Sequence, residues 1–182
     1  MQLTTITLPT GHEVYTCQLN AEYCSDLNEK AQQVVTQLLT LNPLYVRSMG
    51  ARKSVQCGKD YYYYSRKTTH GIDIPPFIQE VMNQLNMRFP VDFNSCLINM
   101  YPHGVQTGIG QHMDNEDCLA HHNVATISLG SACKFEIGGM TIHLPVNTLL
   151  LIPETTNLAV THGIRKYVPT TTRISLTFRK MK

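Results

Sequence analysis

Apolar residues follow helical spacing at two places in the first half of the chain. Between residues 24 and 41 they recur at the spacing of an amphipathic helix, with Ser25 as the predicted N-cap and Asn42-Pro43 as the end. A second helix is predicted to begin at Pro75-Pro76, because proline suits the first helical turn, and its apolar face covers residues 77–85. Both patterns predict helices that pack on a core.

After Pro90 the chain changes to short segments rich in Ile, Val, Leu and Thr, separated by glycine, proline or asparagine. The predicted strands are 95–101, 107–112, 124–129, 133–137, 140–144, 148–152, 157–161 and 171–180. Gly138-Gly139 suits a tight hairpin turn between two of them. A run of strands without intervening helices predicts a jelly roll, or double-stranded β-helix, of two antiparallel sheets.

The whole chain, residues 1–182, is predicted to form a single domain of the α+β class that is mainly β. A chain of 182 residues can bury a sizeable core without disulfides or structural metals. Residues 91–182 are assigned to the jelly-roll core. Residues 1–90 are assigned to N-terminal buttressing helices and a lid of loop and strand. Neither a repeat nor a linker separates them from the rest, so they are predicted to extend the same domain.

Composition and charge argue against a secreted or membrane-spanning protein, but they do not identify a function. Apolar residues make up 42% of the chain and charged residues 15%, and the net charge of +2 does not by itself indicate nucleic-acid binding. The chain begins without a signal-peptide core, and no apolar run is long enough for a membrane span. The six cysteines form no Cys-x-x-Cys pair, which is typical of reduced thiols in the cytoplasm. A cytoplasmic monomer without a membrane segment is predicted.

His112 and Asp114 are the first candidate metal ligands. They lie two residues apart at a predicted strand end, where alternate side chains point the same way. His162, which follows an apolar segment much later in the chain, is the best candidate for a third ligand. Two histidines and a carboxylate form the facial triad of non-haem Fe(II) oxygenases, which leaves positions for a co-substrate and O2. Zinc accepts the same ligands, so the ligand set alone does not name the metal.

The last predicted strand allows two interpretations. Between Arg173 and Arg179 the sequence alternates strictly, so the two arginines, Ser175 and Thr177 share one face while apolar residues share the other. If the polar face points into the jelly roll, two buried guanidinium groups require anionic partners, and a small dicarboxylate beside the metal would supply them. The alternative is a solvent-exposed polar face, which would be the preferred interpretation without a metal site.

Several motifs, taken in order, resemble the AlkB-like family of Fe(II)- and 2-oxoglutarate-dependent dioxygenases. They are Asn99-x-Tyr101, His112-x-Asp114, Ser128-Leu129-Gly130 with Phe135, His162, and Arg173-x5-Arg179. The resemblance is close over the C-terminal half of the chain. Segment 93–101, Phe-Asn-Ser-Cys-Leu-Ile-Asn-Met-Tyr, most resembles the AlkB domains embedded in plant RNA virus replicases.

The resemblance implies which residues bind the cofactors, Fe(II) and 2-oxoglutarate, with O2 as the second co-substrate. His112, Asp114 and His162 would bind iron. The residues that would bind 2-oxoglutarate are Asn99, Tyr101, Arg173, Ser175 and Arg179. Arg173 would take the distal carboxylate, and Arg179 would bind the end nearer the metal and orient Asp114. Many family members have asparagine where this chain has Ser175, which puts its affinity for 2-oxoglutarate in question.

Upstream the resemblance is looser, and it implies a lid that recognises a nucleotide. The residues assigned to substrate binding are Arg52, Tyr61, Tyr62, Tyr63 and Tyr64. Aromatic side chains mixed with basic ones can stack on an extruded base and bind phosphates. The alternative is an ordinary strand beside a solvated basic loop.

The activity that the resemblance implies is oxidative demethylation of N-methylated bases in single-stranded or locally unpaired nucleic acid. 2-Oxoglutarate would be decarboxylated to succinate and CO2 while an N-methyl group is hydroxylated and lost as formaldehyde. RNA is favoured through the viral resemblance, with 1-methyladenine and 3-methylcytosine as expected bases; for a viral domain the location would be the host cytoplasm. Two alternatives stay open: a hydroxylase of a protein side chain or small molecule, and a jelly-roll binding module without turnover.

Overall fold

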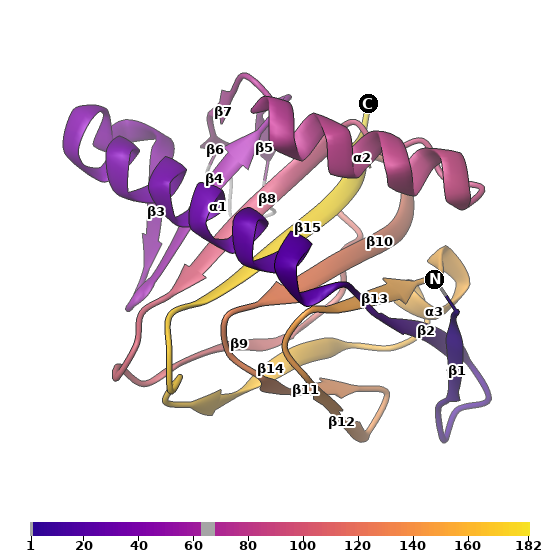
Figure 1. The fold of residues 1–182 in the computed structure, drawn as a ribbon. Coiled ribbons are helices and arrows are strands. Elements are labelled where there is room, and N and C mark those ends of the chain that lie inside the picture. Colours follow the sequence, from indigo (N-terminus) through magenta and orange to yellow (C-terminus); the bar gives the residue numbers. More distant parts are fainter. Residues whose placement is uncertain (1, 63–67) are drawn as a thin grey trace.

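Two facing β-sheets make up most of the structure, a computed structural model that describes residues 2–62 and 68–182 (Figure 1). The major sheet has nine strands, and its described pairs are antiparallel except for the pair of β4 with β7. The minor sheet has four antiparallel strands. This arrangement confirms the predicted jelly roll.

Strands that are distant in the chain lie side by side in both sheets. The order in the major sheet is β1 (Thr4–Thr7), β2 (Glu13–Gln18), β13 (Thr148–Ile152), β10 (Leu119–Leu129), β15 (Arg173–Met181), β8 (Ser95–Tyr101), β4 (Arg52–Cys57) and β3 (Val46–Met49), with β7 (Gly71–Ile72) beside β4. The order in the minor sheet is β12 (Met140–Leu144), β11 (Cys133–Ile137), β14 (His162–Tyr167) and β9 (Thr107–His112). A separate short pair joins β5 (Tyr61–Tyr62) to β6 (Thr68–Thr69).

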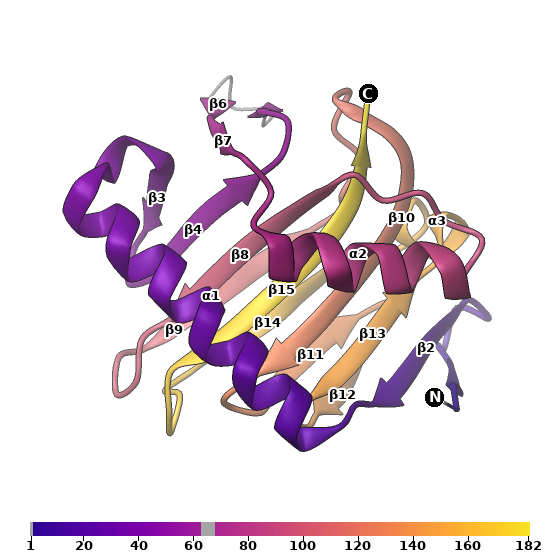
Figure 2. The ribbon, with the colours of Figure 1, turned by 45° about the horizontal axis from the view of Figure 1, so that its top comes forward.

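The two long helices cover the outer face of the major sheet (Figure 2). Helix α1 (Ala21–Leu41) begins earlier than predicted, because Asn20 caps it: the Asn20 side-chain oxygen accepts the N–H of Tyr23 at 2.9 Å. The prediction of Ser25 as the cap is therefore wrong. Helix α2 (Pro76–Arg88) begins within the predicted Pro-Pro pair. Neither α1 nor α2 nor the short α3 described below has the length and apolarity of a membrane span.

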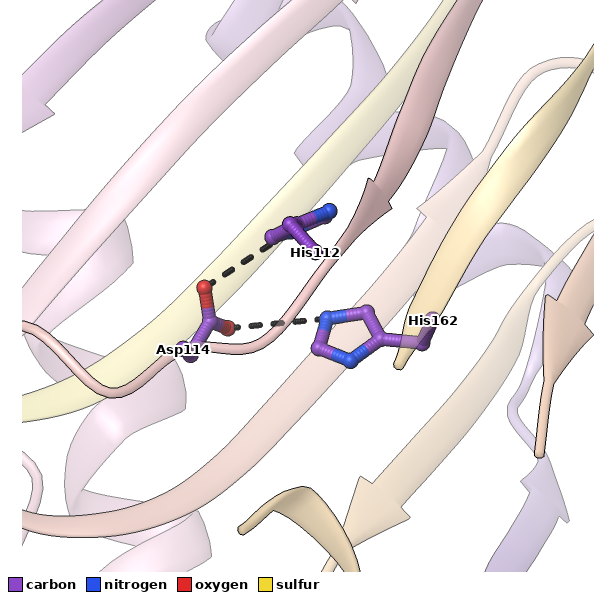
Figure 3. A group of neighbouring side chains, drawn as sticks. All are labelled: His112, Asp114 and His162. Carbon is purple, nitrogen blue, oxygen red and sulfur yellow. Dashed lines mark ion pairs between the residues drawn. The ribbon is translucent and has the colours of Figure 1, made fainter. Parts of the chain in front are cut away.

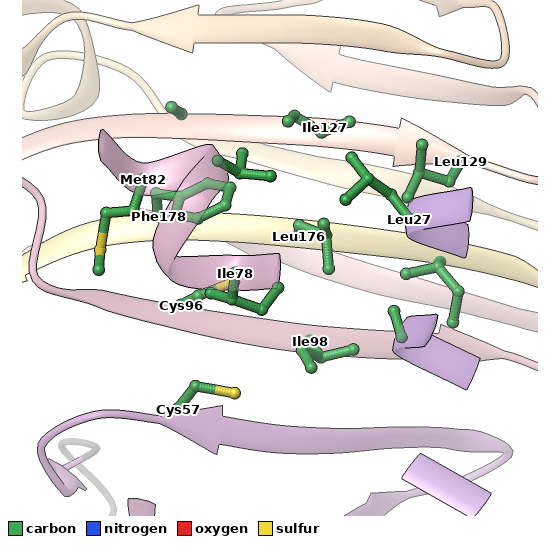
Figure 4. Packing of buried hydrophobic residues seen from close by; sticks show 14 of the residues in the cluster. Leu27, Cys57, Ile78, Met82, Cys96, Ile98, Ile127, Leu129, Leu176 and Phe178 are labelled. Carbon is green, nitrogen blue, oxygen red and sulfur yellow. The ribbon is translucent and has the colours of Figure 1, made fainter. Parts of the chain in front are cut away.

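A large apolar core lies between these helices and the major sheet (Figure 4). Leu27 of α1 and Ile78 of α2 belong to the same buried cluster as Ile98 of β8 and Leu176 and Phe178 of β15. Burial of a side chain of this size contributes about 1.5–3 kcal/mol relative to its exposure. The outer face of the major sheet therefore supplies much of the stability and leaves the inner face available for polar residues.

The alternation predicted for the last strand is present in β15. Its apolar residues at even positions belong to the helix-side core, while Arg173, Ser175, Thr177 and Arg179 line the space between the sheets. All four of these polar residues are buried. The alternative of a solvent-exposed polar face is therefore wrong.

A row of small polar side chains crosses the inner face of the major sheet. Directly paired positions on successive strands carry Ser54, Asn99, Ser175, Ser128 and Thr148. The Ser54 hydroxyl donates to the Asn99 side-chain oxygen at 2.7 Å, and the Asn99 amide nitrogen donates to the Ser175 hydroxyl at 3.4 Å. The sheet thus has one apolar face and one buried polar face.

Most predicted strands have the observed bounds, but one is wrong. Residues 157–161 do not form a strand, because Pro153 and Glu154 open a helical turn, α3 (Glu154–Asn157), and the strand β14 begins only at His162. Strand β10 begins at Leu119, well before the predicted residue 124. Strands β1, β2, β3 and β4 were not predicted, so residues 1–90 contribute strands to the major sheet as well as helices.

Candidate metal centre and cofactor pocket

A cavity of about 420 Å³ lies between the two sheets, and it brings the predicted site residues together. The inner faces of β8 and β15 contribute the predicted cofactor-binding residues to its wall. The predicted residues that line it are Arg52, Tyr61, Asn99, Tyr101, His112, Asp114, His162, Arg173, Ser175 and Arg179. Tyr62 is 56% exposed and is not part of this wall, whereas Tyr63 and Tyr64 lie outside the described residues.

The three candidate metal ligands converge at one end of the cavity (Figure 3). His112 ends β9 and His162 begins β14, and the two are direct cross-strand partners. Asp114 follows β9 in the adjoining loop. Its Oδ1 lies 3.7 Å from His112 Nε2 and its Oδ2 lies 3.8 Å from His162 Nε2. The ligand atoms are all within 4.8 Å of one another, a separation that one ion can bridge.

The surroundings hold Asp114 and His162 in the protonation states that bind a metal. Burial alone raises the pKa of the Asp114 carboxyl, but the Arg179 guanidinium, followed by His162 and His112, outweighs burial and lowers that pKa to about 2. Burial lowers the pKa of the His162 imidazole to about 4, against the opposing effect of the Asp114 carboxylate. An ionised carboxylate and a neutral imidazole are the forms that bind a divalent ion.

Hydrogen bonds orient two of the three ligands. Arg179 donates from Nε and Nη2 to Asp114 Oδ2, at 3.1 and 2.8 Å, so two donors on one oxygen fix the orientation of the carboxylate. His112 Nδ1 lies 2.9 Å from the carbonyl oxygen of Gly110. Because a carbonyl only accepts, Nδ1 carries the proton and the lone pair of His112 is on Nε2, which faces Asp114.

Arg173 marks the other end of the cavity and lacks an anionic partner among the described residues. It is only 1% exposed, its Nη2 donates to Ser128 Oγ at 2.7 Å, and its guanidinium lies 4.7 Å from the centroid of the Tyr101 ring. Its Nε and Nη1 have no hydrogen-bond partner within the described chain, and neither do the buried hydroxyls of Tyr101 and Tyr167. A buried, unpaired guanidinium is costly, so this end of the cavity fits a carboxylate with several acceptor positions.

The structure separates the residues of the predicted lid. Arg52 and Tyr61 are buried in the cavity wall, and the Tyr61 ring lies against the guanidinium of Arg179, with 5.5 Å between Arg179 Cζ and the ring centroid. Tyr62, the next residue along β5, is exposed. The substrate role of these residues stays a prediction.

Glu116 is a cavity residue that the sequence reasoning missed. It is 7% exposed, it lines the cavity close to Tyr61 and Arg179, and its Oε2 has no hydrogen-bond partner among the described residues. The only signal available in the sequence was its place two residues after Asp114. A buried carboxylate oxygen of this kind can accept an N–H group from a bound molecule.

Comparisons with known proteins agree with this geometry. A family model described as 2OG-Fe(II) oxygenase superfamily matches residues 10–179. Two curated relatives, each described as an alpha-ketoglutarate-dependent dioxygenase AlkB homolog and found in two strains of Caulobacter vibrioides, are 29% identical to this chain over 142 residues. The match covers 68% of this chain and 62% of each relative, so the chain spans less than two thirds of their length.

The fold also matches a solved structure, that of OsALKBH1. The TM-score is 0.66 with 16% sequence identity, and the match covers 98% of this chain and 100% of the other. At this level of identity the likeness concerns the fold alone.

Proposed function

The chain belongs to the 2OG-Fe(II) oxygenase superfamily, and from that premise we propose that it is an AlkB-like demethylase of N-methylated bases in nucleic acid, with RNA as the favoured substrate. Its reaction class is that of a dioxygenase, an oxidoreductase that uses Fe(II), 2-oxoglutarate and O2. The observation that carries the proposal is one cavity holding a His/Asp/His triad, an arginine that lacks a carboxylate partner, and a buried carboxylate that can receive a substrate N–H.

In this proposal His112, Asp114 and His162 hold Fe(II), and their three ligand atoms leave the remaining positions open. Arg173 and Tyr101 bind the distal carboxylate of 2-oxoglutarate. When bound, Fe(II) and 2-oxoglutarate supply the oxidation, in which one oxygen atom of O2 ends in succinate and the other in the substrate.

The other side chains of the pocket position the reactants and exclude water. Asn99 and Ser175 offer hydrogen bonds to 2-oxoglutarate from the floor of the cavity. Arg179 keeps Asp114 ionised and fixed, which leaves Oδ1 facing His112. A hydroxylated N-methyl group is a hemiaminal, which loses formaldehyde without a positioned acid–base pair, so the protein's contribution is mainly geometric.

Side chains in the cavity wall and next to it in the chain support a nucleobase as the substrate. Adenine and cytosine carry exocyclic amino groups, and the Oε2 of Glu116, which accepts no hydrogen bond among the described residues, can accept one from their N–H groups. Arg52 adds a cation to the cavity wall, and the exposed ring of Tyr62, which follows Tyr61 in the chain, offers a surface on which a base can stack. The preference for RNA rests only on the resemblance of segment 93–101 to viral AlkB domains.

The test is mass spectrometry of matched RNA and DNA oligonucleotides that carry 1-methyladenine, 3-methylcytosine or N6-methyladenine. Wild-type protein with Fe(II), ascorbate and 2-oxoglutarate should remove a methyl group from at least one base and release formaldehyde, with RNA turned over faster than DNA. His112→Ala should be inactive. Succinate release without any loss of methyl groups would favour the hydroxylase of another substrate, and absence of both would favour a binding module.

A further inference from the structure

Asn157 is a fully buried side chain whose hydrogen bonds all go to main-chain atoms, two of them to the candidate metal ligand Asp114. Its Nδ2 donates to the carbonyl oxygen of Asp114 at 2.7 Å and to that of His122 at 2.9 Å, and its Oδ1 accepts the N–H of Asp114 at 3.3 Å. Asp114 lies outside the ladder between β9 and β14, which ends at His112. The side chain of Asn157 therefore takes the place of a sheet partner for the main chain of Asp114.

Asn157 links the two segments of the chain that carry Asp114 and His162. It is the last residue of α3 and lies five residues before His162, while its bonds reach across to the loop that carries Asp114. A displacement of this loop would change the distance from Asp114 to both histidines. One side chain thus sets the separation between the loop after β9 and the segment that leads into β14.

The helical turn that carries Asn157 is itself fixed to the major sheet. The Thr156 hydroxyl donates to the carbonyl of Glu13 at 2.7 Å, the N–H of Glu154 donates to Asn123 Oδ1 at 3.0 Å, and Glu154 Oε1 accepts the N–H of His122 at 3.0 Å. These bonds join α3 to β2 and β10. The main chain that carries Asn157 is therefore fixed relative to the major sheet.

We propose that Asn157 is a positioning residue of the iron site: it holds the main chain of Asp114 so that the carboxylate meets the two histidines. The inference rests on the proposed assignment of His112, Asp114 and His162 as iron ligands and is independent of the substrate. Groups that orient metal ligands typically change metal affinity about 10–100-fold when they are removed.

The chain offers a matched control for this residue. Asn86 of α2 makes the same two-bond contact with one main-chain residue, donating to the carbonyl of Phe93 at 2.9 Å and accepting the N–H of Phe93 at 2.9 Å. Asn86 is not part of the cavity wall. Replacement of either asparagine by alanine removes a similar pair of hydrogen bonds to the main chain of one residue. Only in the case of Asn157 is that residue a candidate metal ligand.

The experiment compares wild type, Asn157→Ala, Asn157→Ser and Asn86→Ala in two measurements: thermal unfolding of the metal-free protein, and calorimetric titration with Mn(II) as a redox-stable probe of the iron site. We expect both alanine variants to lower Tm. Asn157→Ala should weaken Mn(II) binding about 10-fold or more, while Asn86→Ala keeps wild-type affinity. The serine variant, whose side chain is too short to make all three bonds, is the alternative should the alanine variant not fold, and it should also bind Mn(II) more weakly.

Steady-state kinetics adds a readout that general destabilisation does not change. The apparent KM for Fe(II) should rise in the Asn157 variants, while KM for 2-oxoglutarate at saturating Fe(II) stays close to the wild-type value. Mn(II) affinity within twofold of wild type in a folded Asn157 variant would overturn the proposal. Failure of the wild type itself to bind Mn(II) would instead overturn the assignment of the iron ligands and the positioning role with it.

Discussion

The two arginines of β15 have the same chemistry and both are buried, yet their surroundings differ. Arg179 is paired with Asp114 through two hydrogen bonds and lies over the Tyr61 ring. Arg173 has a serine hydroxyl, an aromatic ring and no carboxylate partner among the described residues. Arg179 therefore has its counter-ion within the protein, whereas the proposed counter-ion of Arg173 is the carboxylate of a bound ligand.

Because of this difference, we expect Arg179 to contribute mainly to the stability of the fold and Arg173 mainly to ligand binding. For Arg179, burial alone lowers the pKa of the guanidinium, but the Asp114 carboxylate outweighs burial and raises it, so each charge stabilises the other. A guanidinium without such a partner costs free energy in the folded protein and gains it back when a carboxylate binds. The two residues should therefore respond to the same substitution in different ways.

The largest expected effect is that of Arg179→Met. It leaves the Asp114 carboxylate buried without its cation, and removal of one partner of a buried ion pair typically costs about 3–5 kcal/mol. Urea unfolding of the metal-free protein should show this loss, and Mn(II) binding should weaken as the carboxylate loses its orientation. The control is Arg165→Met, which breaks the exposed ion pair with Glu136 (2.7 Å) and should change stability by less than about 1 kcal/mol. Equal losses of stability in the two variants would show that the buried pair of Arg179 with Asp114 contributes no more than an exposed ion pair.

Arg173→Met should have the opposite pattern. Hydrogen bonds to charged groups contribute about 1.5–3 kcal/mol each, so loss of two should weaken 2-oxoglutarate binding about 100-fold or more. The unfolding free energy of the ligand-free protein should stay the same or increase, because an uncompensated buried charge is removed. Calorimetry with Mn(II)-loaded protein and urea unfolding measure the two quantities. A large loss of stability with 2-oxoglutarate affinity preserved would refute the assignment of Arg173.

Addition of 2-oxoglutarate to the wild type provides a test that needs no substitution. At about one hundred times Kd a ligand that binds only the folded state stabilises it by about 2.7 kcal/mol. The wild type loaded with Mn(II) should gain this amount in thermal or urea unfolding. Arg173→Met should gain almost nothing at the same concentration, whereas Arg165→Met should behave as the wild type does.

The smallest expected effect is that of Ser54→Ala on β4. The Ser54 hydroxyl donates to the Asn99 side-chain oxygen and thereby turns the Asn99 amide nitrogen towards Ser175 and the cavity. Loss of one neutral hydrogen bond is worth about 1 kcal/mol, so KM for 2-oxoglutarate should rise about fivefold. Ser48→Ala on the neighbouring β3 removes an exposed hydroxyl that bonds Lys53 and should leave KM unchanged. If both variants keep the wild-type KM, Ser54 does not orient Asn99.

The strands of the C-terminal half could be predicted because their patterns are local. Polar and apolar residues alternate along β15, and in the structure they lie on opposite faces of the strand as that pattern predicts. Strand β8 is almost wholly apolar on its helix side. Strand β4 was missed for a physical reason: Arg52, Ser54 and Gln56 face the polar interior, so a buried central strand has the composition of a surface loop.

Other features depend on contacts between distant residues and leave no pattern in the sequence. Strand β2 is a partner of β13, more than a hundred residues away, and its own segment of six residues is too short to show a clear pattern. Asn157 looks like any strand or turn residue, because its bonds go to main-chain atoms of Asp114 and His122, which the sequence does not place beside it. Side chains that bind ligands directly are chemically distinctive, whereas those that hold the main chain are not.

The two-faced strand β15 imposes a rule of parity on its length. Arg173 and Arg179 both point inward only because an even number of residues along the strand leads from one to the other. The residues at the positions between, Ile174, Leu176 and Phe178, point the opposite way and pack in the core beneath the helices. Insertion or deletion of one residue between the arginines would turn one of them into the apolar core. Length changes within this segment are therefore acceptable only in pairs, and a pair would still alter the spacing between the metal centre and the carboxylate-binding end.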